Sequence, residues 1–410
     1  MKILISHTTG NENTRNVVYA LMKSQFLHTF IVSIAVYKES LFRYGIFRQF
    51  LKRKLPIQLR PFVVSFPFKE LGRQICNKLN VKLLTKSESS FFSSYSESRY
   101  IDKKSSLFLK KHAKEIDTVY CFEDIALQTF TIAREEKKYR IYDLPIGYWR
   151  AFRKILADEK EKNPDWYVTL GGFNDSNEKV ANKDKEIELA NVIFVASTFT
   201  KKSLSFFPGQ LPPIYVVPYG FPPINSERTY SLQEDRKIRL LYVGGLSQRK
   251  GISYMFKALE GLENFYELTV VGGGDTDIPV LKTALSKHQY LPPMPHDKIL
   301  ELMSKSDILI FPSLFEGFGL VITEAMSQGT PVITTDRTCG PDIITNNEDG
   351  WIVKAADSTS IQNLLIKLKD DKEEIIRVGK NARETASKRP WEVYQQEMVN
   401  LIQNECGGKS

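Results

Sequence analysis

The sequence predicts an α/β protein with two doubly wound domains, each built on a largely parallel sheet. The chain has 410 residues, which exceeds the roughly 250–300 residues that one hydrophobic core can serve. Apolar, β-rich runs alternate with longer helical patterns along the whole chain, as in repeated strand-helix-strand units. A polar stretch at 223–237 interrupts this alternation. These three observations favour two facing domains joined by a linker.

The expected elements can be placed in chain order. The N-terminal domain, residues 1–222, should contain strands near 1–6, 29–36, 117–121, 139–142, 192–196 and 214–217. The C-terminal domain, residues 238–388, should contain strands at 238–243, 267–271, 308–311, 331–334 and 351–353. Residues 389–410 carry apolar side chains at helical spacing, and we expect this helix and tail to pack back on the N-terminal domain. Ligands of such sheets bind beyond the carboxyl ends of the strands, so the site should lie in a cleft between the two domains.

Composition narrows the class of protein without identifying a partner. Hydrophobic residues make up 42% of the chain and charged residues 26%, which is typical of a globular rather than a disordered protein. The net charge of +9 attracts anions, but nucleotide phosphates, acidic lipid headgroups and nucleic acid would all satisfy it. No nucleic-acid-binding motif accompanies the charge, so we expect no nucleic acid partner. The four scattered cysteines predict neither disulfides nor a zinc site.

The segment at 311–335 carries the most informative pattern. A strand ending at Phe311 precedes the loop Glu316-Gly317-Phe318-Gly319, and a helix should run from about Leu320 to Gln328. Glycines before a helix start let backbone N–H groups approach an anion, and the helix dipole favours negative charge there. Glu316 in the loop and Glu324 on the helix could accept hydrogen bonds from hydroxyl groups of a sugar or ribose. By themselves, two glutamates at this spacing are more typical of a solvated helix face.

A second pattern lies at 241–259, where a strand again meets a glycine loop and a helix. Gly244 and Gly245 permit a turn, and Arg249 with Lys250 brings two cations to the helix start. In a chain with 57 Lys and Arg residues, such a pair alone is more typical of a solvated surface.

Together the two segments resemble glycosyltransferase family 4, the retaining glycosyl transferases of group 1 with a GT-B fold. E-G-F-G-L-x3-E-A is similar to the family's E-x7-E element, and G-G-L-x3-K-G is similar to its phosphate loop. The resemblance implies that Glu316 lies against the donor sugar, that Glu324 binds ribose hydroxyls, and that Arg249 and Lys250 neutralise the departing nucleoside diphosphate. Many relatives have arginine where this chain has Gly245, which leaves the role of Arg249 less defined than that of Lys250.

The same resemblance implies the other parts of a donor and acceptor site. The donor-binding set comprises Gly244, Gly245, Gly317, Phe318, Gly319, Leu320, Glu324 and Met294, the last of these in a loop that would contact the nucleobase. Gly10, Asn11, Asn13 and Arg15 resemble a G-N-x-N-x-R start found in some bacterial members, although an ordinary capped helix start has the same pattern. Asp143 and Tyr148 stand where many members have a histidine that contacts the sugar.

The implied reaction transfers a sugar from a nucleoside diphosphate sugar to a hydroxyl acceptor with retention of configuration, in bacterial-type polysaccharide or glycolipid assembly. It needs no metal and no other cofactor, because the helix dipole and the basic pair would stabilise the diphosphate. Two other readings stay open on the same scaffold: a non-catalytic sugar-nucleotide-binding protein, and a GT-B-type epimerase.

The location of the protein is a separate expectation. The chain lacks a secretory signal and a run of about 18 apolar residues, so we expect it in the cytoplasm. Residues 39–62 mix aromatic and aliphatic side chains with arginine and lysine. This segment could form an amphipathic helix that binds peripherally to the inner face of the plasma membrane, where a lipid-linked acceptor would be reached. A helix packed on the N-terminal domain would have the same pattern.

Overall fold

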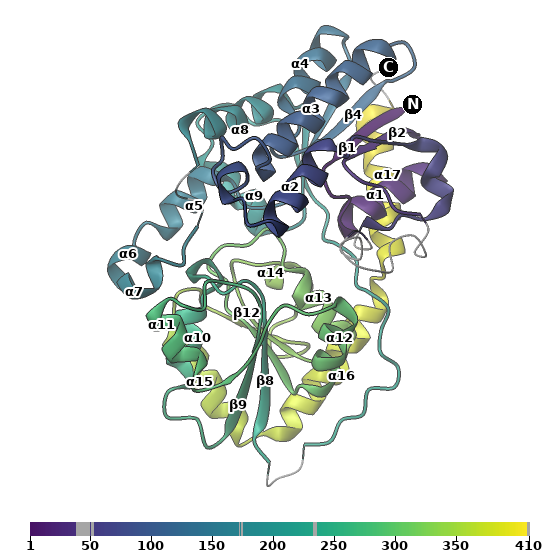
Figure 1. Cartoon of the computed structure of the whole chain (residues 1–410). Coiled ribbons are helices and arrows are strands. Elements are labelled where there is room, and N and C mark those ends of the chain that lie inside the picture. The colour runs from purple at the N-terminus through teal and green to yellow at the C-terminus, as the bar shows by residue number, and fades with distance from the viewer. Residues whose placement is uncertain (38–49, 51–52, 172, 174, 233–235, 408–410) are drawn as a thin grey trace.

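The computed structural model describes residues 1–37, 50, 53–171, 173, 175–232 and 236–407. It contains two parallel sheets, one of seven strands and one of six, each flanked by helices (Figure 1). The predicted α/β class with two doubly wound domains is therefore confirmed. The sheets lie in the upper and lower parts of the molecule in Figure 1, and their facing ends carry the loops of the candidate site.

The N-terminal sheet has the order β3-β2-β1-β4-β5-β6-β7. Its strands are β1 (Ile3–His7), β2 (Leu27–Val32), β3 (Val63–Ser65), β4 (Thr118–Phe122), β5 (Tyr139–Leu144), β6 (Val192–Val195) and β7 (Ile214–Val216). The larger helices around it are α1 (Glu12–Lys23), α2 (Phe68–Lys78), α3 (Ser94–Lys111), α4 (Leu127–Glu135), α8 (Asn177–Leu189) and α9 (Thr198–Ser203). β1 and β4 are buried at every position, which is typical of central parallel strands covered on both faces.

The C-terminal sheet has the order β10-β9-β8-β11-β12-β13. Its strands are β8 (Ile238–Val243), β9 (Tyr266–Val271), β10 (Gln289–Leu291), β11 (Ile308–Phe311), β12 (Val332–Thr335) and β13 (Trp351–Val353). Its helices are α10 (Ile252–Leu259), α11 (Pro279–Leu285), α12 (His296–Lys305), α13 (Leu320–Ser327), α14 (Gly340–Ile343), α15 (Ser358–Lys369) and α16 (Lys372–Lys388). The sequence analysis missed β3 and β10, which have three residues each.

Two helical segments cross from one domain to the other. Helix α17 (Trp391–Cys406) returns to the N-terminal domain and packs on α1, where Gln395 Nε2 donates to Asn16 Oδ1 at 2.7 Å. In the opposite direction, α5 (Trp149–Leu156), α6 (Glu159–Lys162) and α7 (Pro164–Tyr167) leave the N-terminal domain and cover α10 and α11 (Figure 1). Phe152 and Leu156 share an apolar cluster with the core of the C-terminal domain.

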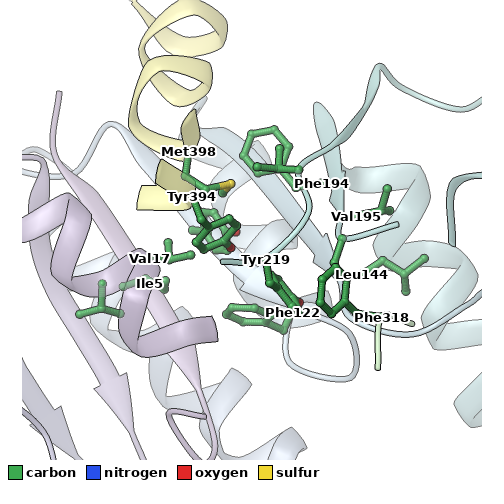
Figure 2. Packing of buried hydrophobic residues seen from close by; sticks show 14 of the residues in the cluster. Ile5, Val17, Phe122, Leu144, Phe194, Val195, Tyr219, Phe318, Tyr394 and Met398 are labelled. Atoms are coloured by element: carbon green, nitrogen blue, oxygen red, sulfur yellow. The ribbon is translucent and has the colours of Figure 1, made fainter. Parts of the chain in front are cut away.

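The two domains also share aromatic packing near their boundary. The Phe318 ring, from the loop before α13, lies 4.7 Å from the Tyr219 ring between their centroids. Tyr219 in turn contacts Tyr394 of α17 at 5.5 Å. Figure 2 shows these three side chains close to Val17 and Phe122 of the N-terminal domain. The loop that carries Glu316 is thus anchored by apolar contacts to the opposite domain.

Most of the segment 39–62, for which we expected an amphipathic membrane helix, lies outside the described residues. In its described part, Lys54 is exposed as expected, but Phe50 and Arg53 do not fit a membrane-facing surface. Phe50 is buried, and Arg53 is largely buried and forms an ion pair with Glu70 at 2.9 Å. Residues Ile57–Phe62 form a short 3-10 helix. Within the part of the chain that the structure describes, no helix is both long and apolar enough to cross a bilayer.

Candidate functional site

Glu316 lies in the loop between β11 and α13 and is mostly buried, with 13% of its side chain exposed. The Lys250 ammonium group donates a hydrogen bond to its Oε2 atom, and the Arg249 guanidinium lies 3.7 Å from the same oxygen. Lys250 Nζ also lies 5.0 Å from the centre of the Phe311 ring, a cation–π contact. The structure therefore brings together the three residues that the sequence predicted to be catalytic.

The electrostatics of this group favour an ionised carboxylate. Burial acts to raise the pKa of Glu316, but the charges of Lys250 and Arg249 outweigh it and hold the pKa below its ordinary value. Burial lowers the pKa of Lys250, and the Glu316 carboxylate opposes that shift. The pair is a part-buried ion pair in which each charge depends on the other.

The loop after β8 is joined directly to the loop after β11. Leu314 N donates to Arg249 O at 2.8 Å, and Arg249 Nη1 donates to Phe315 O at 3.0 Å. Gly251 begins α10 with φ of 71°, and a Cβ at this position would lie 1.9 Å from Pro312 O. Only glycine allows both the left-handed backbone and this close approach. The positions of Arg249 and Lys250 are thus set by the neighbouring loop.

The two glycines after β8 have different surroundings. A Cβ at Gly244 would lie 3.1 Å from the Tyr242 hydroxyl, whereas a Cβ at Gly245 would meet no described atom within 4 Å. The space beside Gly245 is therefore open. Met294 is partly buried in the loop between β10 and α12, next to His296 at the start of α12.

Glu324 lies on α13 and faces a different partner from Glu316. Its Oε1 atom lies 3.0 Å from His296 Nε2, and this hydrogen bond raises the pKa of His296. His296 is more than half exposed. Glu316 thus lies in the loop before α13, and Glu324 lies about one turn into this helix.

The Glu316 loop contacts the N-terminal domain directly. The carbonyl of Gly317 accepts hydrogen bonds from Ser197 Oγ at 2.6 Å and from Thr200 Oγ1 at 2.9 Å. A Cβ at Gly317 would lie 1.9 Å from Pro145 O, in the loop after β5. The carboxyl ends of strands from both sheets therefore meet at this loop, as expected for a ligand site in facing α/β domains.

The predicted N-terminal candidates form a compact turn after β1. Gly10 O accepts from Arg15 Nη1 at 2.8 Å, and Asn11 caps α1 by accepting from Thr14 N at 3.1 Å. Asn13 is buried and donates to the Tyr219 hydroxyl at 2.9 Å. Asn11 thus caps the helix start, as a capped helix requires, and the Asn13 amide is engaged by the Tyr219 hydroxyl.

Asp143 and Tyr148, the two candidates after β5, are both buried. Asp143 accepts from the Tyr120 hydroxyl at 2.6 Å, and burial raises its pKa to about 7. Tyr148 donates to Asp184 Oδ1 at 2.6 Å. In this structure both polar groups are therefore engaged inside the N-terminal domain.

The sequence analysis missed residues that position the loops. His7 ends β1, and its Nδ1 accepts from Thr9 N and Gly10 N, each at 2.9 Å. Burial and the nearby Arg53 lower its pKa to about 3, so the ring is neutral. The sequence signal that could have identified His7 was its position at the carboxyl end of a strand, where ligands of parallel sheets bind. Ser197 and Thr200 follow β6, and no sequence motif marks them as residues that position a loop.

A buried network also fixes the loop before Arg249. Gln248 N donates to Thr169 Oγ1 at 2.8 Å, and Gln248 Nε2 donates to Glu159 Oε2 at 2.7 Å. Glu159 further accepts from the Tyr254 hydroxyl at 2.9 Å. Glu159 belongs to the crossing segment α5–α7 and Thr169 follows it directly, and both are far from Gln248 in the sequence. Among the described residues, no group of three His, Cys, Asp or Glu side chains is arranged to hold a metal ion.

The two-domain arrangement is the GT-B fold, as comparison with solved structures shows. Sucrose-phosphate synthase from Thermosynechococcus elongatus superposes with a TM-score of 0.67 at 17% identity, covering 100% of both chains. HepE from Anabaena, solved in complex with UDP-glucose, superposes with a TM-score of 0.63 at 15% identity, covering 98% of this chain and 100% of that one. At such low identity these likenesses establish the fold.

Sequence similarity concentrates in the C-terminal domain. Residues 224–385 match the family model described as glycosyl transferases group 1. The amylovoran biosynthesis glycosyltransferase AmsK of Erwinia amylovora is 27% identical over 161 residues, which is 36% of this chain and 39% of that protein. Matches to relatives of this kind span about half of the relatives' length or less. The range 224–385 that matches the family model contains Arg249, Lys250, Glu316 and Glu324.

Proposed function

We propose that this protein is a retaining glycosyltransferase that moves a sugar from a nucleoside diphosphate sugar to a hydroxyl acceptor in polysaccharide or glycolipid assembly. One observation carries the proposal. Glu316 is paired with Lys250 and Arg249 on two adjoining loops, at the point where the two domains touch. A carboxylate beside two cations is suited to a reaction that separates charge between a sugar ring and a phosphate.

The two cations would serve the leaving group. As the bond between the anomeric carbon and the phosphate oxygen breaks, its electron pair passes to the nucleoside diphosphate. Lys250, Arg249 and the backbone N–H groups at the start of α13 would stabilise this charge without needing to reorient. These groups would do the work that a divalent cation does in other enzymes, so we propose a reaction without metal.

Glu316 would serve the sugar. Phosphate oxygens of a bound donor would compete with the carboxylate for Lys250, which leaves Glu316 to accept hydrogen bonds from sugar hydroxyls and to stabilise positive charge at the ring. Glu324 would accept from the ribose, and the backbone near Met294 would contact the base. Retention of configuration requires the acceptor to reach the face of the sugar that the phosphate leaves.

The acceptor would bind on the N-terminal side. Arg15, in the first turn of α1, donates a hydrogen bond to Gly10 O in the turn after β1. This turn lies at the carboxyl end of a central strand, where ligands of such sheets bind. A carbohydrate or lipid-linked acceptor would agree with the similarity to AmsK, a glycosyltransferase of amylovoran biosynthesis.

A donor screen followed by turnover measurement tests the proposal. UDP-, GDP- and ADP-sugars are compared for thermal stabilisation, which follows RT ln(1 + [L]/Kd). The preferred donor is then incubated with candidate acceptors, and the anomeric configuration of the product is read by NMR. We expect a product with the donor's configuration. An inverted product would contradict the retaining mechanism, and release of an epimerised sugar nucleotide without transfer would favour the epimerase alternative.

Glu316→Gln provides the decisive variant. It keeps the shape of the side chain and removes its charge, so we expect an unchanged Tm within a few degrees and turnover lowered by about 100-fold or more. Glu267→Gln, an exposed residue paired with Arg239 on the surface, is the matched control and should be near normal. Wild-type turnover in Glu316→Gln would refute the proposed role, and donor binding without any turnover in the wild type would indicate a binding protein.

A further inference from the structure

Helix α2 presents its apolar side chains to solvent, the reverse of an ordinary surface helix. Phe68, Leu71, Ile75 and Leu79 lie at intervals of three and four residues on one face. Phe68 is 55% exposed, Ile75 54% and Leu79 68%. Figure 1 shows α2 on the N-terminal domain, on the side turned toward the C-terminal domain. Large apolar side chains exposed in a row indicate a surface that meets a partner.

The opposite face of α2 is attached to the N-terminal domain by buried ion pairs. Glu70 is almost fully buried and pairs with Arg53 at 2.9 Å and with Arg73. Arg73 also lies 3.3 Å from Glu97 of α3, which accepts from Ser33 Oγ at 2.6 Å. Breaking such buried pairs leaves uncompensated charge, which costs several kcal/mol. The helix is therefore fixed with its apolar face outward and cannot turn that face into the core.

The apolar surface continues beyond the helix. Leu83, in the 3-10 helix Lys82–Leu84, is 88% exposed, and Leu84 and Phe91 are also exposed. Most of the large apolar side chains that the described chain exposes lie between Ile57 and Phe91. The row from Phe68 to Leu83 thus forms one extended patch rather than scattered single residues.

Cations are interspersed with this patch. Lys78, Lys82 and Lys86 are exposed among its apolar residues, whereas Glu70, the acidic residue of α2, is buried. We call the residues Phe68, Leu71, Ile75, Leu79 and Leu83 with these three lysines the α2 surface. The α2 surface is therefore apolar and positively charged.

We propose that the α2 surface docks on a membrane that contains acidic lipids. Apolar side chains would enter the boundary between headgroups and acyl chains while the lysines contact lipid phosphates, as in an interfacial amphipathic helix. A protein partner fits less well, because protein interfaces exclude lysine from their apolar centres. The surface lies on the N-terminal domain, the side on which we place the acceptor, so docking would bring the protein to an acceptor anchored in lipid.

Vesicle sedimentation of the full chain tests this proposal independently of sugar transfer. Vesicles of phosphatidylglycerol with phosphatidylcholine are compared with phosphatidylcholine alone, at low salt and at about 0.5 M salt, where charge screening is strong. We expect binding to the acidic vesicles that weakens at high salt. Replacing Lys78, Lys82 and Lys86 by glutamine should abolish most of the difference between acidic and neutral vesicles.

The apolar residues are tested by a second variant. Replacing Ile75, Leu79 and Leu83 by glutamine should lower the vesicle partition coefficient by about tenfold or more, because less apolar area enters the lipid. Ile366→Gln, at an exposed apolar residue of α15 in the C-terminal domain, is the control and should bind as the wild type does. Turnover with a water-soluble acceptor should be equal in all of these proteins, which separates docking from catalysis.

Three outcomes would overturn the proposal. The first is a failure of the wild type to bind acidic vesicles at low salt. The second is equal binding by the wild type and the triple apolar variant. The third is a dimer in solution that this variant dissolves, without vesicle binding, which would identify the α2 surface as a self-association face.

Discussion

At the scale of single residues, Lys250 links two functions of the proposed site. Its ammonium group contacts Glu316 and lies over the Phe311 ring, so both its charge and its position are fixed before any donor arrives. Preorganised charge of this kind needs little rearrangement as a phosphate becomes more negative. It also keeps Glu316 ionised, because removing Lys250 leaves mainly Arg249, at 3.7 Å, to offset the burial of that carboxylate.

We therefore predict that Lys250→Ala weakens binding of the preferred nucleoside diphosphate as well as turnover. The charge contacts the phosphates in substrate and product alike, so affinity should fall by about 10- to 100-fold in calorimetry. Lys257→Ala, at an exposed lysine of α10, should bind normally. Unchanged affinity in Lys250→Ala would remove the residue from the phosphate site.

Asp143 gives a residue-scale prediction about stability and pH. Burial raises its pKa from an ordinary 3.8 to about 7 in the folded protein. Between these values the folded state holds a proton that the unfolded state has lost, so this group's contribution to stability falls as pH rises. Asp143→Asn resembles the neutral acid and does not titrate. From pH 5.5 to 8, wild type should lose about 2 kcal/mol relative to the variant.

Denaturant unfolding of both proteins at the two pH values measures this difference. Other groups with shifted pKa, such as Glu97 at about 7, are present in both proteins and cancel in the comparison. A constant difference between wild type and variant over this pH range would show that Asp143 is ionised in the folded state.

Much of the donor side could be predicted at this scale, because its residues lie in two short loops with recognisable glycine and charge patterns. The contact of Lys250 with Glu316 follows from adjacent parallel strands, β8 and β11. The N-terminal side was harder, because Asn13 and Asp143 form hydrogen bonds with residues that no local pattern reveals. Tyr219 and Tyr120, their partners, are remote in the sequence or on another strand.

At the scale of elements, the segment α5–α7 acts as a brace across the domain boundary. It starts in the N-terminal domain and ends against α10, where Glu159 and Thr169 hold Gln248 directly before Arg249. The periodicity of these helices predicts helical structure but not the surface that they cover, since the partners lie about 80–90 residues away. The sequence analysis accordingly assigned the whole segment to the N-terminal domain.

Glu159→Gln should test whether this brace positions the phosphate loop. An amide nitrogen cannot accept from Gln248 and Asn163 as the carboxylate oxygen does, so at least one buried donor loses its partner, which costs about 1–3 kcal/mol. We expect Tm to fall by a few degrees and KM for the donor to rise more than kcat falls. Glu161→Gln, exposed on the same helix, should change neither. A lower Tm with normal KM would limit Glu159 to a structural role.

At the scale of the whole molecule, the domains are tied together at both ends of their boundary. The α5–α7 brace lies on one side, α17 crosses on the other, and the Glu316 loop touches the N-terminal domain between them. In two-domain enzymes, closure of the domains brings donor and acceptor groups together and excludes water. The Glu316 loop is the part of the proposed donor site that contacts the opposite domain, so its position depends on how the two domains are arranged.

Gly317→Ala should separate donor binding from closure. The added Cβ would lie 1.9 Å from Pro145 O of the N-terminal domain, so the domains could not approach as closely, while Arg249 and Lys250 would stay in place. We expect nucleoside diphosphate affinity within about twofold of wild type and kcat lowered by about 10-fold or more, because a small displacement of reacting groups is costly. Small-angle scattering should show a larger radius of gyration with the diphosphate bound. Gly171→Ala, whose Cβ would meet no described atom within 4 Å, is the matched control and should behave as wild type. If Gly317→Ala kept normal kcat, this contact would not belong to the reactive arrangement of the two domains.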